Sequence, residues 1–255
     1  MIDLQPYSGM PLTLDETGRL IAGPGIAISD PVPRTVRELR GVLADPEGAA
    51  DGVAYLMYRG VAPADSAADL AAQDVRFDVT VIFPGSLGRE YVKTAGHYHP
   101  EAPGGVAYPE VYEVLHGRAA FLLQRAAADR IDDAVVISAG PGDKVNLPPG
   151  YGHVTINVGD GPLVVCNIVA DGFSSVYDDY ARRRGAAYYL FKAPDGPVAQ
   201  ANPNYDRLPP LRAAQPHRDE RLGLTGEPLF TVWRRQPELF SYLNHPERLP
   251  RGLRP

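Results

Sequence analysis

The sequence predicts an all-β protein, a small antiparallel barrel or double sheet of the jelly-roll kind. Short apolar runs rich in β-branched and aromatic residues follow one another between about residues 75 and 170. Turn sequences such as FPGSLG, GPGD and NVGDGP separate these runs. The 255 residues include 26 Gly and 26 Pro, a composition that argues against a helical bundle. Many short strands at close spacing are typical of a barrel or a jelly roll.

Residues 1–50 are predicted to form an N-terminal arm followed by a short helix. The first 34 residues show no clear periodicity and are expected to be extended. Thr35 and Glu38 then have the spacing of a capping box, and Asp45-Pro46 ends the helix. A polar stretch at 62–74 is expected to be a short helix or a loop.

Residues 51–192 are predicted to form the barrel. Its strands are expected in VRFDVTVIF, REYVKTAGHYH, EVYEVLHG, RAAFLLQ, DAVVISA, DKVNLP, GHVTIN and PLVVCNIVA. A helix in VYDDYARRRG is expected to end at Gly185, and AAYYLFK is expected to be one more strand. The fold is therefore a barrel with short flanking helices.

Residues 193–255 form a Pro-rich C-terminal extension that keeps large apolar side chains, among them Phe230, Trp233 and Phe240. A disordered tail is poor in such residues. The extension is therefore expected to pack on the barrel or on a partner chain.

The charge and the cysteine content exclude several classes of protein. The net charge of −6 gives no support for a nucleic-acid-binding surface. The apolar runs are far shorter than the roughly 20 residues of a membrane span, and the N-terminus lacks the pattern of a secretory signal. The single cysteine, Cys166, excludes an internal disulfide and is expected in the core. We expect a soluble, cytoplasmic protein that binds neither nucleic acid nor membrane.

Three histidines in the predicted barrel have a spacing that suits a metal site. His97 and His99 are two apart, so on a strand both imidazoles face the same side. His153 lies on a later strand, and a carboxylate from Glu110 or Glu113 is nearby in sequence, although only one of the two can face the interior. Such a nitrogen and oxygen donor set suits Fe, Mn, Ni, Co or Zn. The alternative is a partly exposed strand without an ion.

The other histidines, His116, His217 and His245, are expected at a turn and on the surface.

Two motifs resemble those of the cupin superfamily, whose fold is a double-stranded β-helix. The first motif is His-x-His, then Glu, then six residues and Gly, and it matches His97, His99, Glu110 and Gly117. The second motif is G-x5-P-x-G-x2-H-x3-N, and it matches Gly142, Pro148, Gly150, His153 and Asn157. The spacing selects Glu110. One departure is the loop PEAPGGVAYP, which places ten residues between His99 and Glu110.

Within the cupins, residues 35–192 are most similar to the cupin-type, or archaeal-type, phosphoglucose isomerases. The similar segments are FDVTVIFPG, TAGHYHP, PEVYEVLHGRAAFLLQ and PGDKVNLPPGYGHVTINVGDGP. The resemblance implies that one divalent ion per chain is bound by His97, His99, Glu110 and His153. It further implies that Glu110 and Tyr112 are catalytic, and that Thr80, Thr94, Gly96 and Tyr177 contact the substrate, the first three at its phosphate.

The resemblance has one gap. The family usually carries a tyrosine at the end of the last barrel strand, followed by an AGHDY-like run. Here Val169 stands in place of the tyrosine, and only Tyr177 remains of the run. This gap weakens the assignment of the sugar substrate and leaves the predicted metal site unchanged.

The implied activity is metal-dependent interconversion of glucose 6-phosphate and fructose 6-phosphate, by a homodimer. Glu110 is the natural base for proton transfer through an enediol, but a carboxylate that binds a metal is a weakened base. A hydride shift therefore stays open as the other route. Two further readings are a cupin Fe(II) oxygenase and a sugar-phosphate-binding cupin without catalysis.

Overall fold

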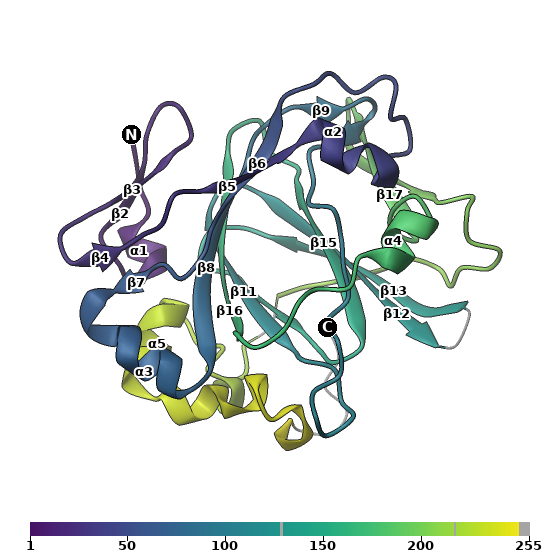
Figure 1. Cartoon of the computed structure of the whole chain (residues 1–255). Helices are drawn as coiled ribbons and strands as arrows, with labels where there is room; N and C mark the ends of the chain where they lie inside the picture. Colours follow the sequence, from purple (N-terminus) through teal and green to yellow (C-terminus); the bar gives the residue numbers. More distant parts are fainter. Residues whose placement is uncertain (128–129, 217, 250–255) are drawn as a thin grey trace.

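Two β-sheets form the centre of the molecule in the computed structural model, which describes residues 1–127, 130–216 and 218–249. The larger sheet has the strand order β14-β11-β16-β8-β6-β5, and the smaller has the order β15-β12-β13-β19 (Figure 1). All neighbours are antiparallel except β13 and β19. The prediction of an all-β fold is confirmed.

The larger sheet contains β14 (Lys144–Leu147), β11 (Glu110–His116), β16 (Leu163–Ala170), β8 (Val75–Ile82), β6 (Val53–Tyr58) and β5 (Val32–Thr35). The smaller contains β15 (Tyr151–Asn157), β12 (Ala119–Ala127), β13 (Arg130–Ala139) and β19 (Arg212–Ala214). A third sheet contains β18 (Gly196–Ala201), β17 (Tyr188–Ala193), β10 (Glu90–Tyr91) and β9 (Ser86–Leu87). The N-terminal region adds β1 (Ile2–Asp3), β2 (Leu12–Leu14), β3 (Leu20–Ala22), β4 (Ile26–Ala27) and, paired with β4, β7 (Ala62–Pro63). The helices are α1 (Gln5–Ser8), α2 (Val36–Leu39), α3 (Ala67–Ala72), α4 (Asp178–Arg182) and α5 (Leu229–Arg235), and the 3-10 turns are η1 (Arg40–Val42), η2 (Ala64–Ser66), η3 (Glu220–Leu222), η4 (Pro237–Leu243) and η5 (Pro246–Arg248).

The larger sheet is buried on both faces. Its inner face packs against the smaller sheet, and the hydrophobic core between them includes Phe121 and Val154 of the smaller sheet. Its outer face packs against the C-terminal helices, where Phe77 of β8 contacts the rings of Phe230 and Trp233. Figure 1 shows α3 and α5 together beside β8. Because both faces are covered, the central strands β11 and β16 are almost entirely buried.

Most of the predicted strands are found, with two corrections. The run 89–99 was expected to be one strand, but only β10 is regular there, and His97 then meets His153 in an isolated bridge. Gly96, at φ +79°, interrupts the extended backbone between them. The sequence reasoning also missed β6, whose run VAYLMY pairs with β8.

The helix after the arm begins as expected. The Thr35 side chain accepts from the Glu38 backbone N–H, and the Glu38 carboxylate accepts from the Thr35 N–H at 2.8 Å. The capping box is therefore confirmed. Within the predicted arm, β5 also pairs with β6 of the large sheet. The domain boundaries at residues 50 and 192 stay predictions.

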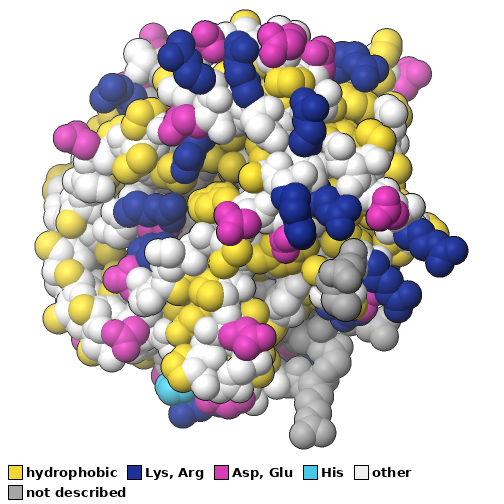
Figure 2. Space-filling model, turned by 45° about the vertical axis from the view of Figure 1, so that its right-hand side comes forward, with side chains coloured by type: hydrophobic (Ala, Val, Ile, Leu, Met, Phe, Trp, Pro, Cys, Tyr) yellow, Lys and Arg dark blue, Asp and Glu magenta, His cyan; other side chains and the backbone are white. Residues whose placement is uncertain are grey.

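The described residues include no helix that is long and apolar enough to cross a membrane. On the face shown in Figure 2, basic and acidic side chains are interspersed with apolar ones.

A buried ion pair ties the C-terminal helices to the larger sheet. Glu113 points to the outer face, where its Oε1 accepts from Lys144 Nζ at 2.9 Å and its Oε2 accepts from the Leu229 N–H, the first residue of α5, at 2.6 Å. Both charged side chains are at most 2% exposed. Because neither charge is hydrated, each depends on the other.

We predict that Lys144→Met lowers the free energy of unfolding by about 3 to 5 kcal/mol, since it leaves the Glu113 carboxylate buried without its cation. The double change Glu113→Gln with Lys144→Met should cost less than the sum of the two single changes. Urea denaturation at pH 7 measures all three. The exposed pair of Arg118 and Asp160 is the control, and Arg118→Gln should cost at most about 1 kcal/mol. Wild-type stability of Lys144→Met would contradict the prediction.

Candidate metal centre and active site

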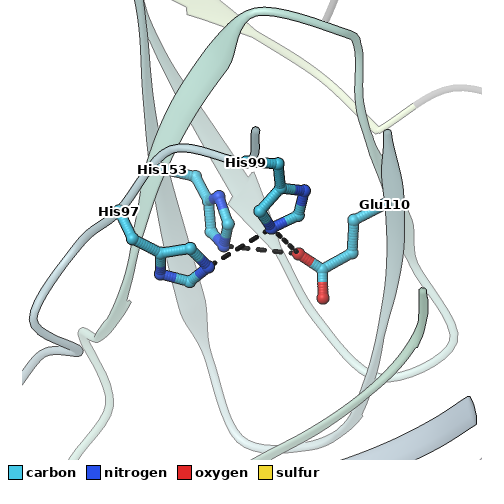
Figure 3. Close-up of side chains that lie close together, drawn as sticks. All are labelled: His97, His99, Glu110 and His153. Atoms are coloured by element: carbon cyan, nitrogen blue, oxygen red, sulfur yellow. Dashed lines mark hydrogen bonds and ion pairs between the residues drawn. The ribbon is translucent and has the colours of Figure 1, made fainter. Parts of the chain in front are cut away.

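The structure brings together the four side chains that were predicted as metal ligands. One donor atom from each of His97, His99, Glu110 and His153 lies within 4.8 Å of the other three (Figure 3). Glu110 Oε2 is 3.4 Å from His99 Nε2 and 3.5 Å from His153 Nε2. The Nε2 atoms of His97 and His99 are 3.3 Å apart. Atoms that present lone pairs do not attract one another. Four such atoms around one point are therefore the arrangement expected of ligands to a cation.

Two local features place these side chains. The backbones of His97 and His153 exchange two hydrogen bonds, of 3.3 Å and 3.0 Å, which sets their imidazoles side by side. The loop at 100–109 then turns back on itself, with a hydrogen bond from the Tyr108 N–H to the Pro100 carbonyl, and leads into β11 at Glu110. The inserted loop therefore keeps Glu110 at the site in spite of the long spacing.

The same loop orients His99. The Nδ1 atom of His99 is 3.0 Å from the Tyr108 carbonyl oxygen, which can only accept. Nδ1 therefore carries the proton and Nε2 presents its lone pair to the cluster, an outer hydrogen bond that is common for metal-bound histidines. Phe173 packs against the His99 ring at 4.6 Å between centroids and stacks on Tyr108.

The protonation states of the three histidines suit metal binding. Burial lowers the pKa of His99 to about 4, and it lowers the pKa values of His97 and His153 well below the usual range, so all three imidazoles are neutral at pH 7. The pKa of the Glu110 carboxyl is raised to about 8, first by burial and then by the charge of Asp78.

One buried oxygen supports the fit of a cation. Glu110 Oε2 has no hydrogen-bond partner among the described residues, although it is buried. A bound cation would supply the missing partner and would favour the charged carboxylate. Three neutral imidazoles and one carboxylate fit a first-row divalent ion.

An open cavity of about 570 Å³ lies beside the cluster. Thr80, Thr94, Tyr112 and Tyr177, all predicted to contact substrate or to act in catalysis, line it. The Tyr112 hydroxyl is 3.1 Å from His153 Nε2, and the Tyr177 ring is 5.3 Å from the His97 ring. A sugar-sized molecule in this cavity has access to both the cluster and the hydroxyl groups.

Gly96 forms the turn that leads into His97 and does not line the cavity with a side chain. Its φ of +79° favours glycine, and a Cβ there would lie 2.5 Å from ring atoms of Tyr180. Thr94 Oγ1 accepts from the Thr155 N–H at 3.0 Å. Thr94 lines the cavity with its hydroxyl partly engaged by Thr155, whereas Gly96 is not among the lining residues.

Sequence reasoning missed a charged group in the cavity wall. Arg59 and Arg76 line the cavity, and Asp78 lies between them. The signal was present in VRFDVTVIF, where Arg76, Asp78 and Thr80 alternate with apolar residues and so share the inner face of β8. Val169 also lines the cavity, beside Glu110 on one side and Arg76 on the other.

The remaining histidines lie away from the cluster where they are described. His116 ends β11, and the His245 side chain is 51% exposed. His217 lies outside the described residues.

Comparisons with known proteins point to one family. The pattern that defines the glucose-6-phosphate isomerase (GPI) family matches residues 33–207. The chain is similar to a glucose-6-phosphate isomerase of Pyrococcus furiosus, with 38% identity over 91 residues, which are 36% of this chain and 44% of that protein. It is 34% identical over 110 residues to a glucose-6-phosphate isomerase of Pyrococcus abyssi, which covers 43% of this chain and 54% of that protein. The match thus spans about half the length of these relatives.

Among solved structures, an oxalate decarboxylase of Lactobacillus farciminis is similar over 48% of this chain and 30% of that chain, with 22% identity and a TM-score of 0.36. A similarity of this extent supports no conclusion about this chain.

We predict that the purified protein binds one divalent ion per chain and that His153→Ala loses it, because the remaining donors no longer surround the site. Chelation should lower the melting temperature of the wild type, since an ion that binds only the folded state stabilises it. Elemental analysis and thermal denaturation check both. His245→Ala, outside the cluster, should retain the ion. Equal metal content in His153→Ala and wild type would refute the assignment.

Proposed function

The chain belongs to the glucose-6-phosphate isomerase family, and on this premise we propose that it interconverts glucose 6-phosphate and fructose 6-phosphate with a bound divalent ion. The observation that carries the proposal is the position of the donor cluster: three of its four side chains, His97, His99 and Glu110, line the cavity that Thr80 and Thr94 also line. The reacting end of a sugar phosphate can lie at the donors while its phosphate lies at the hydroxyl groups.

Glu110 is the proposed base. The reaction moves hydrogen between C2 and C1 of the open-chain sugar. The carboxylate removes the proton from C2, the electron pair of that C–H bond forms the C1–C2 double bond, and the former aldehyde oxygen O1 takes up a proton to give the enediol. The carboxyl group, whose proton can exchange with solvent, then protonates C1 while the C2 hydroxyl loses its proton and becomes the new carbonyl. A divalent ion bound at the site would polarise the sugar oxygens. Tyr112, whose hydroxyl is 3.1 Å from His153 Nε2, would donate a hydrogen bond to one of these oxygens.

Four further residues are proposed to contact the substrate. The hydroxyl groups of Thr80 and Thr94 and the backbone N–H of Gly96 would bind the phosphate. Tyr177 precedes α4 and is 40% exposed. It would contact the sugar at the mouth of the cavity, where its ring lies beside His97.

We predict that Glu110→Gln lowers kcat for fructose 6-phosphate by about 10² to 10⁴, the usual contribution of a positioned acid–base group. Tyr112→Phe should cost a smaller factor, because it removes one hydroxyl and leaves the base in place. A coupled assay measures turnover in protein loaded in turn with Fe, Mn, Ni, Co or Zn. Metal content is measured on the same samples, so loss of the ion is separated from loss of the base.

The result of this assay also separates the alternative functions and routes. A binding protein would show no turnover in the wild type with any ion, and an oxygenase would consume dioxygen in place of isomerising the sugar. Isomerisation in D₂O separates the two routes, because an enediol exchanges the migrating hydrogen with solvent and a hydride shift retains it. Full turnover of metal-loaded Glu110→Gln would refute the role of Glu110.

We also propose that the chain acts as a homodimer in the cytoplasm, the compartment in which a charged sugar phosphate is retained. Light scattering at micromolar concentration should give twice the mass of 27.6 kDa. A single-chain mass would refute the dimer.

A further inference from the structure

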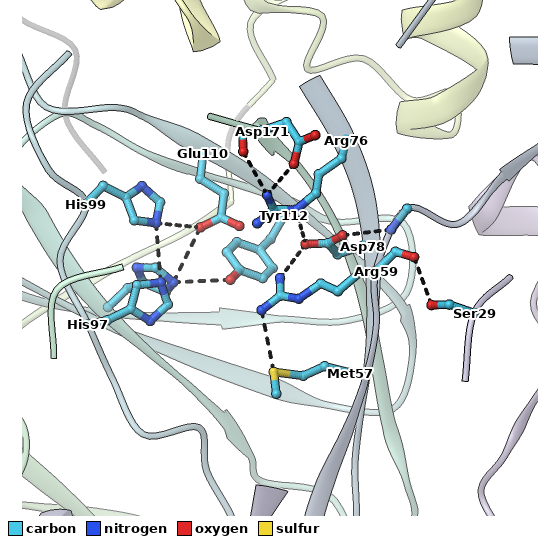
Figure 4. A network of polar contacts seen from close by, with 12 residues as sticks. Ser29, Met57, Arg59, Arg76, Asp78, His97, His99, Glu110, Tyr112 and Asp171 are labelled. Atoms are coloured by element: carbon cyan, nitrogen blue, oxygen red, sulfur yellow. Dashed lines mark hydrogen bonds and ion pairs between the residues drawn. The ribbon is translucent and has the colours of Figure 1, made fainter. Parts of the chain in front are cut away.

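Two arginines reach one wall of the cavity from neighbouring strands. Arg76 is on the inner face of β8, and Arg59 directly follows β6, which pairs with β8. Both side chains extend toward Asp78, as Figure 4 shows. Arg76 Nε donates to Asp78 Oδ2 at 3.0 Å, and Arg59 Nη1 donates to the same oxygen. The two guanidinium groups are thus held together by one carboxylate.

Asp78 is fixed in place. Its side chain is 1% exposed, and its second oxygen, Oδ1, accepts from the Gly60 N–H at 3.1 Å. A buried carboxylate with three donors cannot turn away from the arginines without leaving charges unpaired. Asp78 therefore sets the direction of both guanidinium groups.

The two guanidinium groups share one buried carboxylate, that of Asp78. Asp78 balances one of the two arginines. Arg76 also donates through Nη1 to Asp171 at 2.7 Å, but the Asp171 side chain is 60% exposed, so solvent screens much of its charge. Arg59 Nη2 has only the Met57 sulfur at 3.6 Å as a partner among the described residues. This donor remains available to a molecule in the cavity.

A phosphate in this cavity needs such a cation. The threonine hydroxyls and the Gly96 N–H are neutral donors, and a dianion that leaves water for neutral donors alone loses much of its solvation. Of the residues that line the cavity, all of them described, Arg59 and Arg76 are the only Lys or Arg. Guanidinium groups bind phosphate through two parallel hydrogen bonds, which adds orientation as well as charge.

The position of Val169 also supports a role for Arg76 in the cavity. The sequence has valine here where the family resemblance leads one to expect a tyrosine, and a valine offers no polar contact. In the sheet, Val169 of β16 lies directly opposite Arg76 of β8. The smaller side chain leaves the space beside it to the guanidinium group.

We propose that Arg59 and Arg76, both positioned by Asp78, form the cationic half of the phosphate subsite and make the chain specific for a phosphorylated sugar. This rests on the proposed function. Arg59 and Arg76 contact the phosphate, and Asp78 is a positioning residue that acts through them.

The test compares Arg59→Gln, Arg76→Gln and the double variant with Arg118→Gln, which removes one exposed charge from the end of the barrel. KM for fructose 6-phosphate and the Kd of inorganic phosphate, by calorimetry, should each rise about 10-fold or more in the single variants, as expected for loss of a hydrogen bond to a charged group. The kcat should change by a smaller factor than KM, because the metal ligands and the base Glu110 stay in place. Arg118→Gln should leave all three values unchanged.

Asp78→Asn tests the positioning role. Both arginines stay in this variant but lose the charge that directs them, so KM and the phosphate Kd should rise less than in the double arginine variant. Arg59→Lys, which keeps the charge but not the paired donors, should bind phosphate more tightly than Arg59→Gln.

The outcomes separate the two proposals. A wild type that isomerises the sugar, with KM and phosphate Kd unchanged in the double variant, overturns the role of the arginines and leaves the function standing. A wild type without turnover, whose phosphate Kd still rises in the variants, overturns the function and supports the subsite.

Discussion

The covering of the larger sheet on its outer face is the constraint on which the site depends. Helix α5 and the turns around it bury that face, with Phe77 against Phe230 and Trp233. The hydrophobic stabilisation of the sheet therefore comes largely from outside the cavity. Because the outer face is apolar and covered, inner positions near one end of β8 and β11 can carry the polar side chains Arg76, Asp78 and Glu110. If the inner face were the only one buried, these polar residues would reduce the core that holds the sheet in place.

Strand alternation then divides neighbouring residues between two tasks. Glu110 and Glu113 are three apart on β11, so they point to opposite faces. Glu110 faces the cavity with the histidines, and Glu113 faces outward, where it binds Lys144 and the first N–H of α5. One strand thus supplies one side chain of the donor cluster and the attachment of the helices that bury the sheet. A shift of one residue in its register would exchange these roles and lose both.

The sequence predicted the fold class and the four side chains of the donor cluster, because the strand pattern and the two cupin-like motifs can each be recognised within a short segment. The capping box at Thr35 and the strand pattern of β11 can be read within a few residues. Other features depend on partners that are far away in sequence. His97 meets His153 through a single bridge and not through a regular strand, and the Arg59–Asp78 pair needs the pairing of β6 with β8. The charges in VRFDVTVIF are consistent with an exposed face until the opposite sheet is known to cover it.

The cavity holds two polar groups, the donor cluster and the arginine pair. The donor cluster and the arginine pair occupy different strands, with Tyr112 contacting the cluster at His153. If the substrate is a sugar phosphate, its charged end and its reacting carbons bind to different groups, and the phosphate contacts fix the position of the carbons. Binding energy at the unreactive end then serves orientation at the reactive end, so a sugar without phosphate should lose rate as well as affinity. Under the two proposals, specificity would depend on Arg59, Asp78 and Arg76, and chemistry on Glu110.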